Sequence, residues 1–329
     1  MAARGFFGVD AVAWDRVCAL GNLNAAIAYL TLVRGSDASG RRTRWSKTSL
    51  KTYVGMSLSR GERAIEMLID AKIIARLSPS KNSRSQLYEL LPGSSRPDGE
   101  DVERIWLPNS LIHGAGREKP ALVRLRERRD FPALQLFIAV YRELDLPGYG
   151  GVSWAKISEE IQLDRLGSRG PATAFSITRR DRWVGTLPLA FARPFSDPDN
   201  GRFDEKSFFE ALFWLRRDGL VEVIPHVVED EAEDGEIVLP FAPFGGGAVE
   251  EREIAEIIHD AAFDLLAPEL RKKVEDNDLT LVAFPTRYAN AVVRGVFRPR
   301  HLASTARTME WRDGLREKRD SLLALSHCY

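Results

Sequence analysis

The stretch TRWSKTSLKTYVGMSLSRGERAIEMLIDAKIIARLSPSKNSRSQLYELL, from Thr43 to Leu91, decides the fold predicted for the N-terminal part of this chain. It predicts two helices joined by a tight turn and followed by a two-stranded hairpin. The first helix is expected over Thr48 to Val54. Gly55 then ends it, because glycine readily adopts the left-handed conformation that follows a helix. Ser59 is expected to cap the second helix, with Glu62 three residues later completing a capping-box pattern.

The second helix and the hairpin are amphipathic. Apolar residues of the helix recur at the spacing of one packed face, namely Ala64, Ile65, Leu68 and Ile69. Arg60 and Arg63 fall on another side. The segments 73–77 and 86–90 are typical of strands, and the basic segment 80–84 between them is expected to form the hairpin tip.

This order of elements resembles the winged helix-turn-helix family, with Leu23 to Val33 as the first supporting helix. The resemblance covers roughly Leu20 to Leu91 and implies DNA binding, in which a helix enters the major groove and the hairpin touches the neighbouring backbone. A helical hairpin beside a small sheet, with no ligand, is the alternative.

The local charge favours DNA. Between Arg34 and Arg84 the chain carries twelve lysines and arginines against four acids, a net charge of +8, whereas the whole chain has a formal charge of zero. Such an asymmetry is what a phosphate-binding surface requires. The segment 34–42 is expected to be a flexible basic loop, either a solvated turn or an arm that follows the DNA backbone.

Ten side chains are therefore candidate DNA contacts. Those at base edges of the major groove are Ser59, Arg60 and Arg63; those on the backbone are Lys81, Asn82 and Arg84; those acting through their charge are Arg41, Arg42, Arg44 and Lys47.

A second module is expected over residues 131–243, because the order of elements repeats there. Residues 134–144 and 154–161 would be its first two helices and 203–218 its third, followed by strands at 220–228 and 236–241, with residues 162–202 as an insertion. Its hairpin tip holds five acids, which phosphates would repel. Its third helix is rich in large aromatic residues, which favours a dimer or partner interface through Phe208, Phe209, Phe213 and Trp214.

The predicted fold class is mainly α with small antiparallel β wings. The predicted domains are a winged helix module at 1–92, a linker with a short helix at 93–130, the second winged helix-like module at 131–243, and a helical C-terminal region at 248–329. In that last region 279–284 is expected to be a strand, and 288–296 and 303–325 to be helices.

The sequence offers little for catalysis. Cys18 and Cys328 give neither a disulfide framework nor a zinc spacing, and the five histidines are scattered. Pro198-Asp199 with Asp204-Glu205-Lys206 superficially resembles a nuclease metal site, but Asp204 suits a helix cap better. No metal, cofactor or catalytic residue is predicted. Neither a signal peptide nor a membrane span is seen, so a cytoplasmic, nucleoid-associated protein is expected.

These observations predict a non-catalytic, double-stranded DNA-binding protein that forms a homodimer or binds another protein partner. The tandem arrangement resembles the replication initiators and transcription regulators of bacterial plasmids and phages. The alternative is an interaction subunit of a larger DNA-associated or defence complex, which would use winged helices as docking surfaces.

Overall fold

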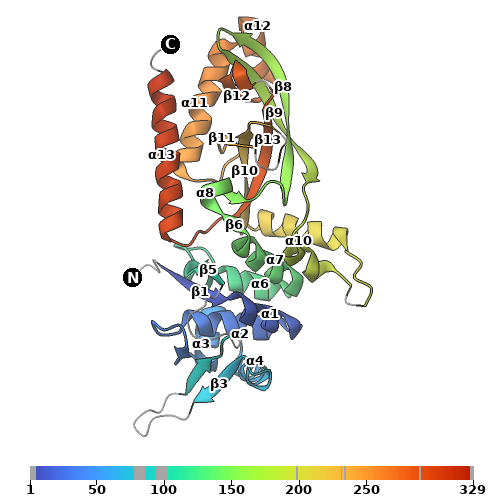
Figure 1. Ribbon diagram of the computed structural model, residues 1–329, viewed down its shortest axis with the longest axis vertical. Coiled ribbons are helices and arrows are strands. Elements are labelled where there is room, and N and C mark those ends of the chain that lie inside the picture. The colour runs from blue at the N-terminus through green and yellow to red at the C-terminus, as the bar shows by residue number, and fades with distance from the viewer. Residues whose placement is uncertain are drawn as a thin grey trace. The chain divides into compact units, whose positions relative to one another are not determined.

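The computed structural model describes residues 5–77, 86–93, 103–197, 199–230, 232, 235–288 and 290–326. The chain folds into two compact units (Figure 1). Unit 1 comprises Met1–Arg142, Ala190–Leu215 and His301–Thr305. Unit 2 comprises Glu143–Leu189, Arg216–Arg300 and Ala306–Tyr329.

The basic segment of unit 1 contains the helices and the hairpin that the sequence predicts. In chain order its elements are α2 (Leu23–Arg34), β2 (Arg42–Thr43), α3 (Lys47–Val54), α4 (Leu58–Asp70), β3 (Ile74–Leu77) and β4 (Leu87–Leu90). The strands form one antiparallel sheet in the order β2-β4-β3. Helix α2 is the centre of this part, because its residues from Ala25 to Val33 are buried on every side.

The rest of unit 1 is mostly helical. A two-stranded ribbon pairs β1 (Phe6–Asp10) with β5 (Arg104–Pro108). The helices are α1 (Ala11–Ala19), α5 (Ser110–His113), α6 (Ala121–Arg128), α7 (Phe131–Arg142), the last three residues of α9 (Leu189–Ala192), η1 (Arg193–Phe195) and most of α10 (Glu205–Arg217). Phe208 of α10 is buried, in ring contact with Phe195 of η1, so α10 packs on its own unit through this aromatic pair.

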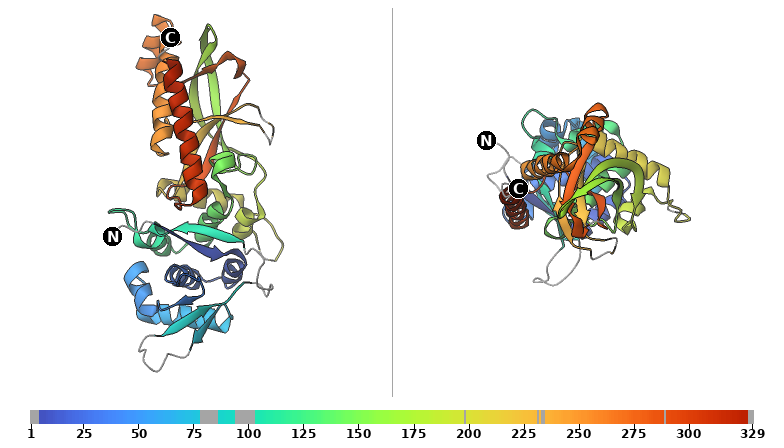
Figure 2. Two further views of the ribbon diagram at one scale, coloured as in Figure 1. Left: turned by 60° about the vertical axis from the view of Figure 1, so that its left-hand side comes forward. Right: turned by 90° about the horizontal axis from the view of Figure 1, so that it is seen from above.

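Unit 2 is built on a six-stranded antiparallel sheet. In spatial order its strands are β11 (Ile237–Pro240), β10 (Val221–Val228), β13 (Val292–Pro299), β8 (Ser158–Arg169), β9 (Ala172–Val184) and β12 (Thr280–Pro285). Smaller elements are β6 (Leu144–Asp145), α8 (Leu146–Tyr149), β7 (Gly151–Val152) and η2 (Thr286–Tyr288). The helices α11 (Val249–Leu265), α12 (Pro268–Asp276) and α13 (Ala306–Ser326) complete the unit. Figure 2 shows α11 and α13 running side by side beside the sheet and the β8–β9 hairpin curling.

The core of unit 2 lies between the sheet and α11. Side chains from the strands, such as Phe175, Val282 and Phe284, meet Ile254 and Ile258 of α11. Phe175 and Phe284 stack across the β9–β12 pair, with ring centroids 4.6 Å apart. Burial of this apolar stripe therefore fixes the helix on the sheet.

The structure overturns the predicted fold class. The chain is α+β with a large curled sheet, not mainly α with small wings. The predicted helix over 154–161 and insertion over 162–202 are wrong, because this region forms β8 and β9, two long strands that pair with each other and with strands far along the chain. Polar and apolar residues alternate at its start (Glu160, Ile161, Gln162, Leu163), which is the period of a strand.

The C-terminal region is not simply helical either. Residues 292–299, most of which fall in a predicted helix, form β13 in the middle of the sheet, where β-branched Val292, Val293 and Val296 are favoured. The predicted hairpin of β10 and β11 is present. However, most of α10, which was expected to complete a second winged helix with those strands, belongs to unit 1, whereas the strands belong to unit 2.

A buried ion cluster joins three elements of unit 2. Arg298 of β13 is 1% exposed and donates two hydrogen bonds to Glu251 of α11, at 2.9 and 2.5 Å, and one to Glu222 of β10, at 2.7 Å. Its guanidinium also lies 4.8 Å from the ring centroid of Trp311 on α13. Burial alone would lower the pKa of Arg298, but the two carboxylates outweigh it and raise the pKa.

Substitution of Arg298 by methionine is expected to destabilise the fold by about 3–5 kcal/mol, because Glu251 would stay buried without its partner. The free energy of unfolding in denaturant measures this effect. The control is Lys206→Met, whose side chain is 86% exposed and lies 3.8 Å from Glu210, itself 64% exposed. An exposed pair of that kind contributes at most about 1 kcal/mol. Equal losses in the two variants would contradict the assigned role of Arg298.

Because of His226 of β10, the stability of unit 2 is expected to depend on pH. This side chain is fully buried, with its Nδ1 2.8 Å from the carbonyl oxygen of Ile224, and burial lowers its pKa from 6.5 to about 4. Below pH 6.5 the unfolded chain therefore takes up a proton that the folded chain excludes, and stability falls until the pH reaches about 4.

At pH 5, protonation of His226 in the unfolded chain is expected to reduce the free energy of unfolding by about 2 kcal/mol relative to pH 7. The His226→Gln variant removes the titrating group, so its stability should change less between these pH values. Denaturant unfolding at both pH values measures the difference, with His259→Gln as the control. The same pH dependence in wild type and in His226→Gln would show that His226 does not carry it.

Candidate nucleic-acid interface

Helix α4 is amphipathic, and its packing determines which residues it exposes. Gly61, Ala64, Ile65 and Leu68 form its buried stripe. The helix begins at Leu58 after Ser57, and Ser57 makes no side-chain capping bond. The prediction that Ser59 is the cap is therefore wrong, because Ser59 already lies in the first turn. The capping box instead occurs on α3, between Ser46 and Ser49.

The exposed side of α4 carries three of the predicted contacts. Ser59, Arg60 and Arg63 are all exposed. Arg60 and Arg63 are three residues apart and Ser59 and Arg63 four apart, so they are neighbours on the helix surface. Neither arginine makes an ion pair or a side-chain hydrogen bond with any residue that the structure describes. Both guanidinium groups are available to a ligand.

Two of the three acidic residues of α4 are engaged by bases from neighbouring elements. Lys47 of α3 binds Glu62 at 2.7 Å, and its hydrogen bond and charge lower the pKa of that carboxyl group. Arg76 of β3 forms an ion pair with Glu66. These pairs offset the two negative charges closest to Arg60 and Arg63. Lys47, predicted to act through its charge, is thus paired with Glu62.

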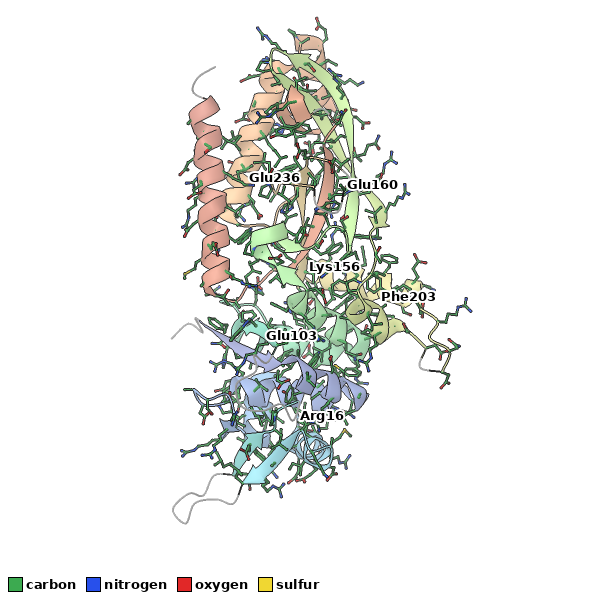
Figure 3. The ribbon with its side chains drawn as sticks, in the orientation of Figure 1. Arg16, Glu103, Lys156, Glu160, Phe203 and Glu236 are labelled. Atoms are coloured by element: carbon green, nitrogen blue, oxygen red, sulfur yellow. The ribbon has the colours of Figure 1, made fainter. Side chains whose placement is uncertain are left out.

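The far end of α4 is fixed to α1. Arg16 of α1 is labelled in Figure 3. Its guanidinium donates to the carbonyl oxygens of Ala71 and Lys72, at 3.1 and 3.0 Å. These carbonyls follow the last turn of α4, where a cation is favoured by the helix dipole. The attachment holds the helix at its C-terminal end and leaves the N-terminal turn exposed.

The basic loop before α3 is ordered, which departs from the expected flexible loop. The backbone N–H of Asp37 donates to the carbonyl oxygen of Arg42 at 2.8 Å, and Ser36 bridges Thr43, so the loop is closed into a small hairpin. Arg41, Arg42 and Arg44 are exposed on it. The loop therefore presents their charges from a fixed backbone.

An aromatic cluster supports this loop. Trp45 stacks on Tyr53 of α3, with ring centroids 4.4 Å apart, and His113 of α5 meets both rings edge to face. Trp45 also lies against the backbone of Gly35, where a Cβ would be 2.2 Å from the indole ring. Glycine is therefore required at position 35 for the indole to occupy this place.

The other predicted residues are placed as follows. Lys81, Asn82 and Arg84 lie outside the described residues. On α10, Phe208 is buried in the core, Phe209 is half-buried, Trp214 lies under the guanidinium of Arg128 at 4.5 Å, and Phe213 is 64% exposed. The structure thus leaves Phe213 as the exposed member of the predicted interface. Sequence reasoning also missed Arg16 and Gly35, whose roles depend on contacts distant in the sequence.

The nuclease-like pattern has a structural explanation. Asp204 accepts hydrogen bonds from the backbone N–H and the hydroxyl of Ser207, at 3.1 and 2.7 Å, as a cap at the start of α10. These bonds lower its pKa. Within the described ranges, no group of three or more His, Cys, Asp or Glu side chains is arranged to hold a metal ion.

Comparisons with known proteins give no match from which the function of this surface could be inferred. No family model, no curated protein and no solved structure matches this chain. Of the helices in the described part of the chain, none has both the length and the apolar character needed to cross a bilayer.

A methyl group added at Gly35 is expected to displace Trp45. Gly35→Ala should destabilise the protein by about 1–3 kcal/mol, as overpacking does, and should weaken the near-UV circular dichroism of the Trp45–Tyr53 stack. Gly314→Ala on α13 is the control, because its Cβ would meet no atom within 4 Å. That variant should be stabilised by roughly 0.5–1 kcal/mol through helix propensity. An unchanged signal and stability in Gly35→Ala would contradict the close packing.

Proposed function

We propose that unit 1 binds double-stranded DNA and that α4 enters the major groove, without catalysis and without a cofactor. The observation that carries this proposal is the exposed pair Arg60 and Arg63 in the first turns of an amphipathic helix, with the neighbouring carboxylates engaged by Lys47 and Arg76. Arginine is the residue that most often recognises guanine in the major groove, through two parallel hydrogen bonds.

The arrangement of elements supports the same proposal. The order helix, strand, two helices and hairpin, with a sheet ordered β2-β4-β3, is that expected of a winged helix. In that arrangement the exposed residues Arg42 and Arg44 on the loop before α3 would contact phosphates, together with Lys81, Asn82 and Arg84. Phosphate contacts of this kind fix the register, whereas Ser59, Arg60 and Arg63 would contact base edges.

We further propose a role as a transcription regulator or replication initiator of a bacterial mobile element, acting in the cytoplasm as a homodimer. A second candidate is an interaction subunit of a larger DNA-associated or defence complex. Phe213 favours it, since a phenylalanine that is 64% exposed on α10 is typical of a surface that another protein covers. Co-purification of a stable partner through Phe213, with no affinity for DNA, would favour the second candidate.

The two groups of bases are expected to differ in their effect on DNA binding. Arg60→Ala should remove one base contact, costing about 1–3 kcal/mol on a selected site and little on random duplex, so that sequence preference relaxes. Arg44→Ala or Lys81→Ala should weaken all sequences alike and lower the salt slope of binding by about one. Selection of bound genomic fragments, followed by salt-titrated binding to a selected site and to random duplex, measures both effects.

The control is Lys272→Ala, which removes an exposed positive charge from α12 in unit 2 and should leave both measurements unchanged. The proposal fails if the wild-type protein shows no salt-dependent affinity for duplex DNA. The assigned roles fail if Arg60→Ala and Arg44→Ala reduce specific and random binding equally.

A further inference from the structure

Four side chains of unit 1 gather beside the loop before α3. They are Arg34, the last residue of α2, Trp45, Tyr53 in the last turn of α3, and His113 at the end of α5. Tyr53 stacks on Trp45 with ring centroids 4.4 Å apart, and His113 meets the Tyr53 ring edge to face at 5.0 Å. The guanidinium carbon of Arg34 lies 5.9 Å from the ring centroid of Trp45. We call these four side chains the Arg34 cluster.

Arg34 is the first indication that this cluster takes a ligand. It is half-buried, its Nε is fully enclosed, and its guanidinium has neither a hydrogen bond nor an ion pair with any residue that the structure describes. Burial lowers its pKa, and Tyr53 is the other group that acts on that pKa, so no carboxylate of the described residues compensates the charge. A half-buried cation without a partner is costly. An anionic ligand would offset this cost.

Capping of α2 does not account for the position of Arg34. A base at the C-terminal end of a helix commonly binds the last carbonyl oxygens. Here the N–H of Gly35 donates to the carbonyl oxygen of Leu32 at 3.1 Å, and the hydroxyl of Ser36 donates to that of Val33 at 2.6 Å. These carbonyls are thus bonded without the guanidinium. The indole at 5.9 Å is close to the limit of about 6 Å for a cation–π contact, and a ring face leaves the N–H groups unbonded.

His113 and Tyr53 add two further donors. The polar atoms of the two side chains make no hydrogen bond with a described residue, and they are not fully enclosed, so a ligand can reach them. Burial lowers the pKa of His113, and the charge of Arg34 lowers it further, with no carboxylate of the described residues acting on it. A neutral imidazole and a phenol can each donate one hydrogen bond. The cluster therefore offers donors from three helices around one positive charge.

We infer that the Arg34 cluster binds a phosphate group, with the Arg34 guanidinium as the charged contact and the His113 imidazole and the Tyr53 hydroxyl as further hydrogen-bond donors. The tetrahedral oxygens of a phosphate can meet donors that come from three helices, whereas a planar carboxylate offers only two oxygens in one plane. The phosphate belongs either to a nucleic-acid backbone or to a small phosphate compound. This inference goes beyond the proposed function, because none of these residues is among the ten candidate contacts and because it does not require α4 to bind DNA.

The experiment titrates inorganic phosphate into the full-length protein at constant ionic strength and measures binding by calorimetry, with acetate as the comparison anion. Wild type is expected to bind phosphate and not acetate, Arg34→Met to bind phosphate about tenfold more weakly, and Tyr53→Phe about fivefold more weakly. Both variants should keep the thermal stability of wild type, because neither removed group has a partner among the described residues. Arg128→Met is the matched control, since Arg128 also lies over a tryptophan, 4.5 Å from the ring centroid of Trp214, but is paired with Asp130 at 3.0 Å. Its phosphate affinity should equal that of wild type.

The histidine resonances of wild type locate the bound phosphate. A negative ligand beside an imidazole favours its charged form, so phosphate is expected to raise the pKa of His113. The groups that face His113 are Trp45, Tyr53 and Arg34, and of these only Arg34 is charged. An NMR pH titration with and without phosphate measures the shift, and His113→Gln identifies the resonance among the five histidines. An identical titration of His113 in both conditions would overturn the inference.

A parallel titration with duplex DNA separates the two sources of phosphate. Loss of both phosphate and DNA affinity in Arg34→Met would identify a backbone phosphate, whereas loss of phosphate affinity alone would identify a small phosphate compound. The inference is overturned if wild type binds no phosphate, or if Arg34→Met binds it as tightly as wild type does. If phosphate is bound through Arg34 while Arg60→Ala leaves DNA binding unchanged, the inference stands and the proposed role of α4 fails.

Discussion

The buried stripe of α4 is the constraint on which the candidate interface depends. Because Ala64, Ile65 and Leu68 must face the core, the rotation of the helix is fixed, and Arg60 and Arg63 must face outward. The hydrogen bonds from Arg16 then fix the end of the helix beyond its last turn. Apolar packing and one buttressing arginine therefore determine which charges the surface displays, and the ion pairs of Glu62 and Glu66 determine how strong its positive potential is.

In unit 2, by contrast, several arginines are paired with glutamates instead of being displayed on the surface. Arg298 is buried with Glu251 and Glu222, and Glu159, buried in the sheet, pairs with Arg179 and Arg216. On α13, Arg316 and Arg319 pair with Glu250 and Glu253 of α11. Arg298 thus holds α11 to the sheet, and Arg316 and Arg319 hold α13 to α11. Because the whole chain has a formal charge of zero and the segment from Arg34 to Arg84 carries +8, the rest of the chain carries a net charge of −8.

Local signals in the sequence predicted much of unit 1 and little of unit 2. The left-handed Gly55, the apolar spacing in α4 and the strand segments around 74–77 and 87–90 all act over a few residues, and each of these elements is present. The strands β8, β9 and β13 were missed, although residues 160–163 show the period of a strand and β8 and β9 pair with each other. The pairs β8–β13 and β9–β12, which place these strands in one sheet, join residues more than a hundred positions apart, so no local pattern reports them. The place of α10 was missed for a related reason. Its aromatic residues are compatible with a second winged helix, and only the contact of Phe208 with Phe195 shows where the helix packs.

In the candidate site, too, features set by neighbouring residues were predictable from the sequence, whereas features set by tertiary contacts were not. The positions of Arg60 and Arg63 on an exposed helix face follow from the helical period, so the sequence was sufficient. The fixed conformation of the loop at 36–44 was not predictable from the sequence, because it depends on Trp45, which stacks on Tyr53 and lies over Gly35. This fixed conformation would affect the affinity of the loop for DNA. A loop that is already fixed loses less conformational entropy on binding than a flexible arm, so charges presented from a closed hairpin give more affinity for the same number of phosphate contacts.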